Sequence, residues 1–249
     1  MSITLQFHPD WPFRGGLVIE ALARDGVYRS QFETGTSNGG LTAHPGGDRW
    51  HWESRLFEGR YDAGPAAERP VYGALNHRGR AHGGSVRFGS AYLRLRPEVT
   101  ARATFCFPDS VFAPEDVGGP DLLPRLVALA DAAGHDVLDD YVEAHVHGGV
   151  RLDRDVEAVV LDPCFRGGPV EAAARDLGCP VEWHPGFSVR TDGLDASYRG
   201  PEIVGLARSL GEVLTPDLIG AAARAGEHDP QALKRVWHLL ARFGCPRAG

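Results

Sequence analysis

One segment of the chain concentrates side chains that can carry acid–base or ligand chemistry. Read as a strand, residues 140–148 alternate between two faces, because successive side chains of a strand point to opposite sides. One face would present three small apolar side chains to a core. The other would present a phenol, a carboxylate and two imidazoles, about 7 Å apart at each step: Tyr141, Glu143, His145 and His147. This segment is the main candidate for a functional site.

Three chemistries can use such a face. Glu143 can stabilise a sugar that becomes cationic as its leaving group departs. A histidine can act as a general base. His145 and His147 can also bind one metal ion, with Glu143 or Asp109 as a third ligand and one coordination position left open. The alternative without function is a polar outer face whose histidines bond to neighbouring loops.

An arginine interrupts a second predicted strand, residues 27–32, which precedes a glycine-rich loop at residues 34–49. A guanidinium group inside a small sheet needs an anionic partner, and a pyrophosphate suits its planar fork. Arg29 is therefore a candidate ligand-binding residue. The alternative is a structural ion pair with a nearby Glu or Asp.

A third predicted strand, residues 86–95, places a serine between two aromatic rings. Phe88, Ser90 and Tyr92 alternate onto one face of this strand. A small hydroxyl beside flat rings can seat a planar heterocycle. The alternative is a serine within an aromatic core stripe, and this strand taken by itself favours that alternative.

Short strands and glycine-rich loops must position these residues. The pattern predicts further strands at residues 3–7, 71–76, 101–107 and 157–161, and helices at 17–25, 50–57 and 122–133. Residues 101–107 are expected to pair with 86–95 across a short turn. After about Pro163, helices are predicted at 170–177, 201–210, 216–225 and 231–243, the last two starting with an N-cap and a proline. Strands first and helices later predict an α+β protein.

Composition narrows the class of protein. The 249 residues carry a net charge of −7, which argues against general nucleic-acid binding. No apolar run approaches the roughly 20 residues of a membrane span. The first residues do not resemble a signal peptide, so we expect a cytoplasmic protein. The four cysteines lie far apart without a Cys-x-x-Cys pair, which disfavours a zinc ribbon.

The three candidate segments follow one another in an order that resembles the Arg-Ser-Glu arrangement of ADP-ribosyltransferases. The matching triplets are Val27-Tyr28-Arg29, Phe88-Gly89-Ser90 and Tyr141-Val142-Glu143, within residues 26–163. Nearly the whole chain is also similar to a bacterial family, domain of unknown function 3626. That second resemblance is carried by residues 28–40, 72–76 with 87–90, and 141–148.

The transferase resemblance implies a split antiparallel β-sheet with NAD bound between its halves. Arg29 would hold the phosphates or the nicotinamide-side ribose, and Ser90 would orient Arg29 or that ribose. Phe88 or Tyr92 would stack on nicotinamide. Glu143 would bind the ribose 2′-hydroxyl and stabilise the cationic sugar as nicotinamide leaves.

The same resemblance suggests a supporting set of residues, and the change from strands to helices after about Pro163 suggests a domain plan. The loop at residues 34–47 would close over the ligand. Residues 1–165 would form the NAD-binding catalytic core, and residues 166–249 a helical segment packed on it. The remaining expected contacts of NAD and catalysis come from Gln31, Asn76, Tyr141 and His145.

Two departures from the better-known pattern leave the acceptor open. Phe88-Gly89-Ser90 replaces the Ser-Thr-Ser triplet, and Tyr141 stands where arginine-specific relatives have Glu or Gln. The hypothesis is a toxin- or effector-like enzyme that moves ADP-ribose from NAD to an unknown acceptor, most simply a protein, with possible delivery by a secretion system. The alternatives are a metal-dependent hydrolase using His145 and His147, and a non-catalytic ligand-binding protein.

Overall fold

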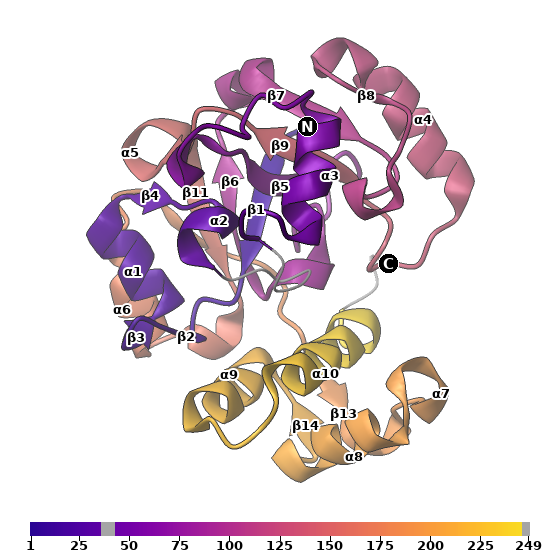
Figure 1. Ribbon diagram of the computed structural model, residues 1–249. Helices are drawn as coiled ribbons and strands as arrows, with labels where there is room; N and C mark the ends of the chain where they lie inside the picture. The colour runs from indigo at the N-terminus through magenta and orange to yellow at the C-terminus, as the bar shows by residue number, and fades with distance from the viewer. Residues whose placement is uncertain (36–42, 246–249) are drawn as a thin grey trace. The chain divides into compact units, whose positions relative to one another are not determined.

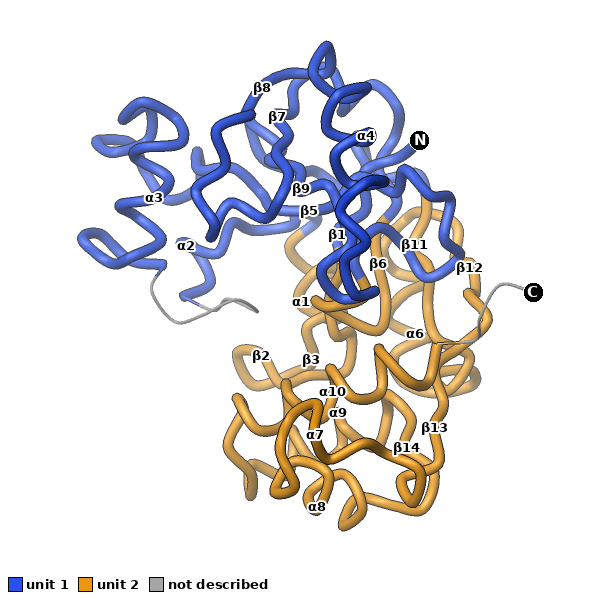
Figure 2. Tube along the Cα trace, turned by 90° about the vertical axis from the view of Figure 1, so that its right-hand side faces the viewer, with its two compact units in different colours: residues 1–5, 26–85, 94–157 blue, residues 6–25, 86–93, 158–249 orange. Residues whose placement is uncertain are grey.

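The chain folds into two compact units, each assembled from several segments (Figures 1 and 2). The structure is a computed structural model that describes residues 1–35 and 43–245. Unit 1 comprises residues 1–5, 26–85 and 94–157, and unit 2 comprises residues 6–25, 86–93 and 158–249. The expected division after residue 165 remains a prediction. The two units are groups of residues that lie close together in space, and each combines segments from different parts of the chain.

An antiparallel sheet forms the centre of unit 1. Its strands are hydrogen-bonded in the order β1 (Ile3–Phe7), β5 (Val71–Leu75), β9 (Val142–Val146), β7 (Ala103–Cys106) and β8 (Val117–Gly118). The start of β1 belongs to this unit and pairs with β5. β9 lies between β5 and β7 and pairs antiparallel with both. The candidate strand is therefore central in its sheet rather than at an edge.

Short elements complete unit 1. β4 (Val27–Tyr28) and β10 (Val150–Arg151) form a two-stranded ribbon. The α-helices are α2 (Gln31–Thr34), α3 (Asp48–Leu56), α4 (Leu123–Ala133) and α5 (Leu152–Asp155). The 3-10 turns are η1 (Ala66–Glu68), η3 (Pro97–Arg102), η4 (Ser110–Phe112) and η5 (Pro120–Leu122).

Unit 2 combines a few strands with most of the long helices. Within it β12 (Val181–Trp183), β11 (Val156–Leu161) and β6 (Ala91–Leu95) are neighbours in that order, and β11 and β12 run parallel. Two ribbons pair β2 (Pro12–Phe13) with β3 (Gly16–Leu17), and β13 (Val189–Arg190) with β14 (Val213–Leu214). The turns η2 (Val86–Phe88), η6 (Pro163–Phe165) and η7 (Thr191–Gly193) also belong to it. Its helices are α1 (Val18–Asp25), α6 (Pro169–Arg175), α7 (Ala196–Arg199), α8 (Pro201–Leu210), α9 (Pro216–Ala225) and α10 (Pro230–Phe243).

Helix α10 shows how local sequence fixes an element. The Asp229 carboxylate accepts a hydrogen bond from the Ala232 amide at 2.9 Å, and Pro230 takes the first helical position. Its apolar residues recur with helical spacing and are buried, including Trp237, whose indole N–H donates to the Val86 carbonyl at 3.0 Å. α10 packs against α8 and α9, as Figure 1 shows. The helices predicted at 201–210, 216–225 and 231–243 are confirmed as α8, α9 and α10.

Three predicted elements differ from the structure. The strand predicted at 27–32 ends at Tyr28, because Ser30 and Glu33 form a capping box that starts α2. The strand predicted at 86–95 is a 3-10 turn followed by β6, which begins only at Ala91. Within residues 101–107 only Ala103–Cys106 form a strand, β7, and its partners are β9 and β8, so the predicted hairpin with 86–95 is wrong.

At a coarser level, the fold class agrees with the expectation. The chain is a mixed α/β protein with a large, mostly antiparallel set of strands and several helices. Among the described residues, no helix combines the length and apolar character needed to cross a bilayer.

Candidate functional site

The candidate strand β9 is buried on both of its faces. Val142, Ala144 and Val146 are fully buried, as predicted for the core face. The opposite face is not the polar outer face of the alternative without function, since Glu143 is 5% exposed and His145 is 0% exposed. Polar groups that are hidden from water need hydrogen-bond partners, so the contacts of this face define what it can do.

Helix α3 and the turn that follows it cover this polar face. The Phe57 ring meets the rings of His145 and His147 edge-on, with centroids 5.3 Å apart in both pairs. The Tyr61 ring stacks on His147 at 6.0 Å. From α3 itself, the Arg49 guanidinium lies over the Tyr72 ring at 4.8 Å. The polar residues of β5, β9 and β7 therefore lie between the sheet and an aromatic cover.

A chain of hydrogen bonds runs along the face from Tyr61 to Glu143. Tyr61 Oη lies 2.6 Å from His147 Nδ1, and His147 Nε2 lies 3.0 Å from Thr104 Oγ1. The same hydroxyl is 3.1 Å from His145 Nδ1, and His145 Nε2 is 2.7 Å from Glu143 Oε1. Register places these groups together, because Thr104 is opposite His145 across the β7–β9 ladder.

The donors of this chain fall into one consistent order. A carboxylate only accepts, so His145 Nε2–H donates to Glu143, and His145 Nδ1 then accepts from the Thr104 hydroxyl. Thr104 in turn accepts from His147 Nε2–H, and His147 Nδ1 accepts from Tyr61. Each of the four donors passes one hydrogen bond along the chain toward Glu143. Each histidine therefore needs only one N–H, at Nε2.

The electrostatics of the two ends agree with that order. Burial raises the pKa of Glu143, but hydrogen bonding to His145 outweighs burial and brings the pKa below its ordinary value. Burial lowers the pKa of His147 to about 4, with help from His145, Arg60 and Arg102. These directions favour an ionised Glu143 carboxylate and a neutral His147 ring within a nearly dry site.

A second carboxylate lies beside Glu143. Asp109 caps η4, accepting from the Val111 amide at 2.9 Å, and its other oxygen accepts a hydrogen bond from the Tyr141 hydroxyl. Burial raises the pKa of Asp109 to about 6, and the charge of Glu143 adds to the rise. Neighbouring carboxyl groups whose pKa values are pushed apart are typical of acid–base sites.

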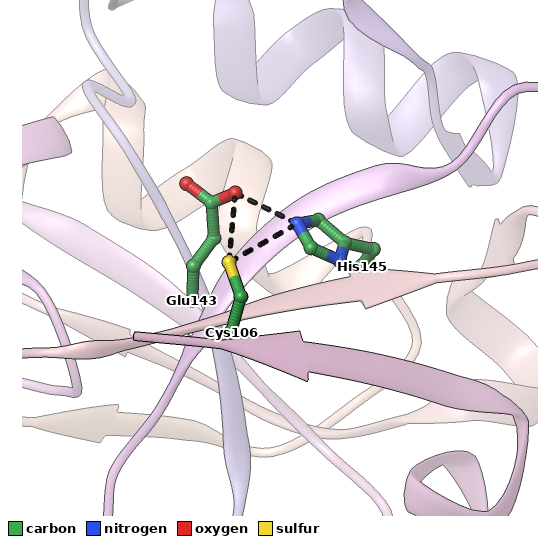
Figure 3. Close-up of side chains that lie close together, drawn as sticks. All are labelled: Cys106, Glu143 and His145. Atoms are coloured by element: carbon green, nitrogen blue, oxygen red, sulfur yellow. Dashed lines mark hydrogen bonds and ion pairs between the residues drawn. The ribbon is translucent and has the colours of Figure 1, made fainter. Parts of the chain in front are cut away.

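Cys106 is the cluster member that the sequence analysis missed. It lies directly opposite Glu143 across the β7–β9 ladder. Its sulfur lies 4.0 Å from both Glu143 Oε1 and His145 Nε2, as Figure 3 shows. A nucleophile relay would place the thiol and the carboxylate on different ring nitrogens, whereas here both approach Nε2. Burial also raises the pKa of this thiol, so the arrangement does not support a thiolate nucleophile.

The other predicted contacts within unit 1 have partners of their own. Arg29 forms an ion pair with Glu33 of α2, with 3.1 Å between Nη1 and Oε1. Gln31 is the first residue of that helix. Asn76 closes a turn, because its amide donates to the Arg80 carbonyl at 2.8 Å and its oxygen accepts from the Arg80 amide at 2.9 Å.

The aromatic–serine motif belongs to unit 2. Ser90 is buried, and its carbonyl accepts a hydrogen bond from His184 Nε2 at 2.8 Å. Its hydroxyl has no hydrogen-bond partner among residues 1–35 and 43–245. Tyr92 is buried in β6, and Phe88 ends η2. Of the predicted site residues, the structure thus brings together Tyr141, Glu143 and His145. The predicted closing loop falls partly on residues 36–42, outside the described residues.

Fold and site together define a mixed α/β protein with a carboxylate–imidazole–thiol cluster buried on an antiparallel sheet. A family model described as "Protein of unknown function (DUF3626)" matches residues 2–133 and 122–243, so the chain belongs to this family. It is also 28% identical over 166 residues to the "Gene 2 protein" of Mycobacterium phage D29, covering 57% of this chain. The match spans 60% of the phage protein's length.

Proposed function

We propose that this protein transfers ADP-ribose from NAD to an acceptor, with Glu143 as the catalytic carboxylate. In this reaction the bond between the ribose and the nicotinamide nitrogen breaks, and its electron pair leaves with nicotinamide. The ribose becomes cationic until an acceptor nucleophile adds to it and loses a proton. The observation that supports the proposal is the geometry of Glu143, a carboxylate that is almost fully buried and held by His145 Nε2 at 2.7 Å.

The dry surroundings make Glu143 suited to that task. A negative charge acts on a developing cation much more strongly where water is excluded than in bulk solvent. His145 fixes the carboxylate through a 2.7 Å hydrogen bond, so the group does not have to reorient during the reaction. The chain through Thr104 and His147 fixes His145 in turn. His145 is thus a positioning residue in this proposal.

Asp109 is the group suited to take the proton of the acceptor. Its pKa of about 6 lies close to neutral pH, where a general base works best. The Tyr141 hydroxyl holds it beside Glu143. This gives Tyr141 a role that replaces the Glu or Gln expected there in arginine-specific relatives.

The NAD-binding part of the proposal rests on the resemblance. Arg29 would leave its ion pair with Glu33 and bind the phosphates of NAD instead. Gln31 and Asn76 would add hydrogen bonds to NAD. Ser90, with Phe88 or Tyr92, would bind the nicotinamide riboside, as the resemblance to ADP-ribosyltransferases implies.

The geometry does not favour a hydrolase with a metal held by His145 and His147. The Thr104 hydroxyl hydrogen-bonds both rings, at His145 Nδ1 and His147 Nε2. It occupies the position between the two rings that a shared ion would need. Thr104 therefore couples the two histidines as hydrogen-bonding partners.

The test is nicotinamide release from NAD by the purified protein, with and without cell lysate as a source of acceptor. We expect release that depends on lysate, and loss of at least about 10² in rate in Glu143→Gln, as when one stabilising group is removed. Glu98→Gln removes the same charge from an exposed site and should match wild type. No release and no NAD binding by the folded wild-type protein would overturn the proposal and favour a non-catalytic protein.

A further inference from the structure

We propose that Cys106, Glu143 and His145 form a binding site for a zinc-like divalent cation. Their donor atoms, one sulfur, one oxygen and one nitrogen, converge on one space in Figure 3. The sulfur is 4.0 Å from each of the other two atoms, which are 2.7 Å from one another. Strand register creates this triangle, since Cys106 is opposite Glu143 and His145 follows two residues later on the same face.

The triangle is close to the size that zinc requires. Zinc binds sulfur at about 2.3 Å, and imidazole nitrogen or carboxylate oxygen at about 2.0–2.2 Å. At tetrahedral angles, the ligand atoms then lie about 3.3–3.7 Å apart. The two longer sides must therefore shorten by roughly 0.4 Å and the short side lengthen by roughly 0.6 Å, which side-chain torsions can supply.

The donor set selects the class of cation. Thiolate and imidazole are the ligands of zinc and similar transition metals, whereas magnesium and calcium prefer oxygen ligands. Three protein ligands leave a fourth position for water or a further group. Two hydroxyls lie near this position, because the Ser110 hydroxyl interacts with Glu143 and the buried Tyr72 hydroxyl feels its charge. Either hydroxyl can bind a water molecule on the ion.

The second layer of contacts is already in place. Thr104 Oγ1 lies 3.1 Å from His145 Nδ1, the nitrogen that does not face the proposed ion. Metal-binding histidines typically donate that N–H to a fixed acceptor, which sets the tautomer and ring orientation. His147 extends this support one step further.

Binding the ion requires a defined set of proton shifts. The Cys106 thiol proton leaves to solvent, so that the thiolate binds the metal. The proton of His145 Nε2 also leaves, and His145 takes one at Nδ1 from Thr104. Thr104 is reprotonated by His147, His147 by Tyr61, and Tyr61 by solvent. One proton is released in total, and the order of donors along the chain reverses.

A bound cation would also regulate the proposed reaction. It would occupy the Glu143 carboxylate and cancel the negative charge that the cationic ribose needs. This consequence rests on the proposed function, whereas metal binding itself does not. We therefore expect zinc to suppress nicotinamide release in proportion to occupancy of the site.

Cobalt(II) titration of the chelator-treated protein tests the site directly, because a thiolate ligand gives cobalt a charge-transfer absorption band. We expect one equivalent of cobalt to produce the band in wild type and in Cys179→Ser, the matched control. Cys106→Ser should lose the band, and Thr104→Val should bind cobalt about 10-fold more weakly, as for loss of a supporting contact.

Two results would overturn the proposal: no band in the folded wild-type protein, or an unchanged band in Cys106→Ser. Circular dichroism shows whether Cys106→Ser folds. If it does not fold, the cobalt affinity of Thr104→Val provides the test, and an unchanged affinity would then overturn the proposal. Nicotinamide release by the metal-free protein is measured separately. A cobalt band without any release would refute the proposed reaction alone, and release without a band would refute the metal site alone.

Discussion

At the scale of single residues, the site is a set of polar groups whose donors and acceptors match. Tyr61, His147, Thr104 and His145 each pass one hydrogen bond toward Glu143. A buried polar chain of this kind stabilises the fold only while every member has its partner, because an unpaired buried group costs free energy. Stability and the charge state of Glu143 are therefore linked through Thr104.

Removing the hydroxyl of Thr104 should expose that link. Thr104→Val keeps the shape of the side chain but leaves one nitrogen of each histidine without its partner. We expect the free energy of unfolding to fall by about 1–3 kcal/mol, the usual cost of an unsatisfied buried polar group. Urea denaturation measures it, with Thr100→Val in the preceding turn as the control. Equal stability of the two variants would show that the chain does not hold the cluster together.

At the scale of elements, sequence alternation predicted which β9 residues share a face, and the hydrogen bonds confirm that grouping. It could not predict that α3 covers that face, because burial depends on contacts between distant segments. It also missed Cys106 and Thr104, although both alternate onto one face of the predicted strand 101–107. Joining them to Glu143 needed the partner of that strand, which was predicted wrongly.

Local signals explain the two strands that were overestimated. The Ser30–Glu33 capping box was readable from sequence and would have ended the strand predicted at 27–32. In the strand predicted at 86–95, Gly89 is the informative residue. A Cβ atom there would lie 2.2 Å from the Phe7 carbonyl oxygen, so the backbones of this segment and β1 approach closely. That approach depends on tertiary contacts, which alternation alone does not reveal.

Gly89→Ala should consequently disturb packing within unit 2. The added methyl group forces the backbone apart, and we expect the free energy of unfolding to fall by about 3 kcal/mol, as for other overpacked sites. Gly205→Ala is the matched control, because Gly205 lies exposed within α8 with open space around it. That substitution should raise the free energy by about 0.5–1 kcal/mol. Similar effects of both substitutions on thermal unfolding would contradict the close packing.

At the scale of the whole molecule, we expect two buried histidines of unit 2 to make the free energy of unfolding sensitive to acid. His8 is stacked on Trp11 at 4.5 Å, and burial, with the charge of Lys234, lowers the pKa of His8 to about 3. Burial likewise lowers the pKa of His238 to about 2. A depressed pKa in the folded state means that stability is complete above about pH 6.5, the unfolded pKa, and is lost as pH falls.

We predict that His8→Phe reduces this acid sensitivity. Phenylalanine keeps a ring beside Trp11 but takes up no proton on unfolding. Between about pH 6 and pH 4, wild type should lose about 1.4 kcal/mol per pH unit more than the variant. Urea midpoints measured across this range test the difference, and the half-exposed His228→Phe provides the control. Parallel pH profiles of wild type and His8→Phe would exclude a neutral buried His8.

The two family resemblances seen in the sequence are supported to different extents. Membership of the DUF3626 family is confirmed over nearly the whole chain. The assignment to the ADP-ribosyltransferases remains a proposal. It rests on three individual residues, Arg29, Ser90 and Glu143. Of these, Arg29 and Glu143 belong to unit 1, and Ser90 belongs to unit 2. These three residues do not specify which molecule accepts the ADP-ribose.

The central claim is that the buried Glu143 carboxylate acts mainly by stabilising the ribose cation that forms as nicotinamide leaves, and contributes little to NAD affinity. The most direct test measures the NAD dissociation constant and the turnover number of Glu143→Gln together, beside Glu98→Gln. We predict an NAD affinity within about twofold of wild type and a turnover number lower by at least about 10². Unchanged turnover in folded Glu143→Gln would contradict the account.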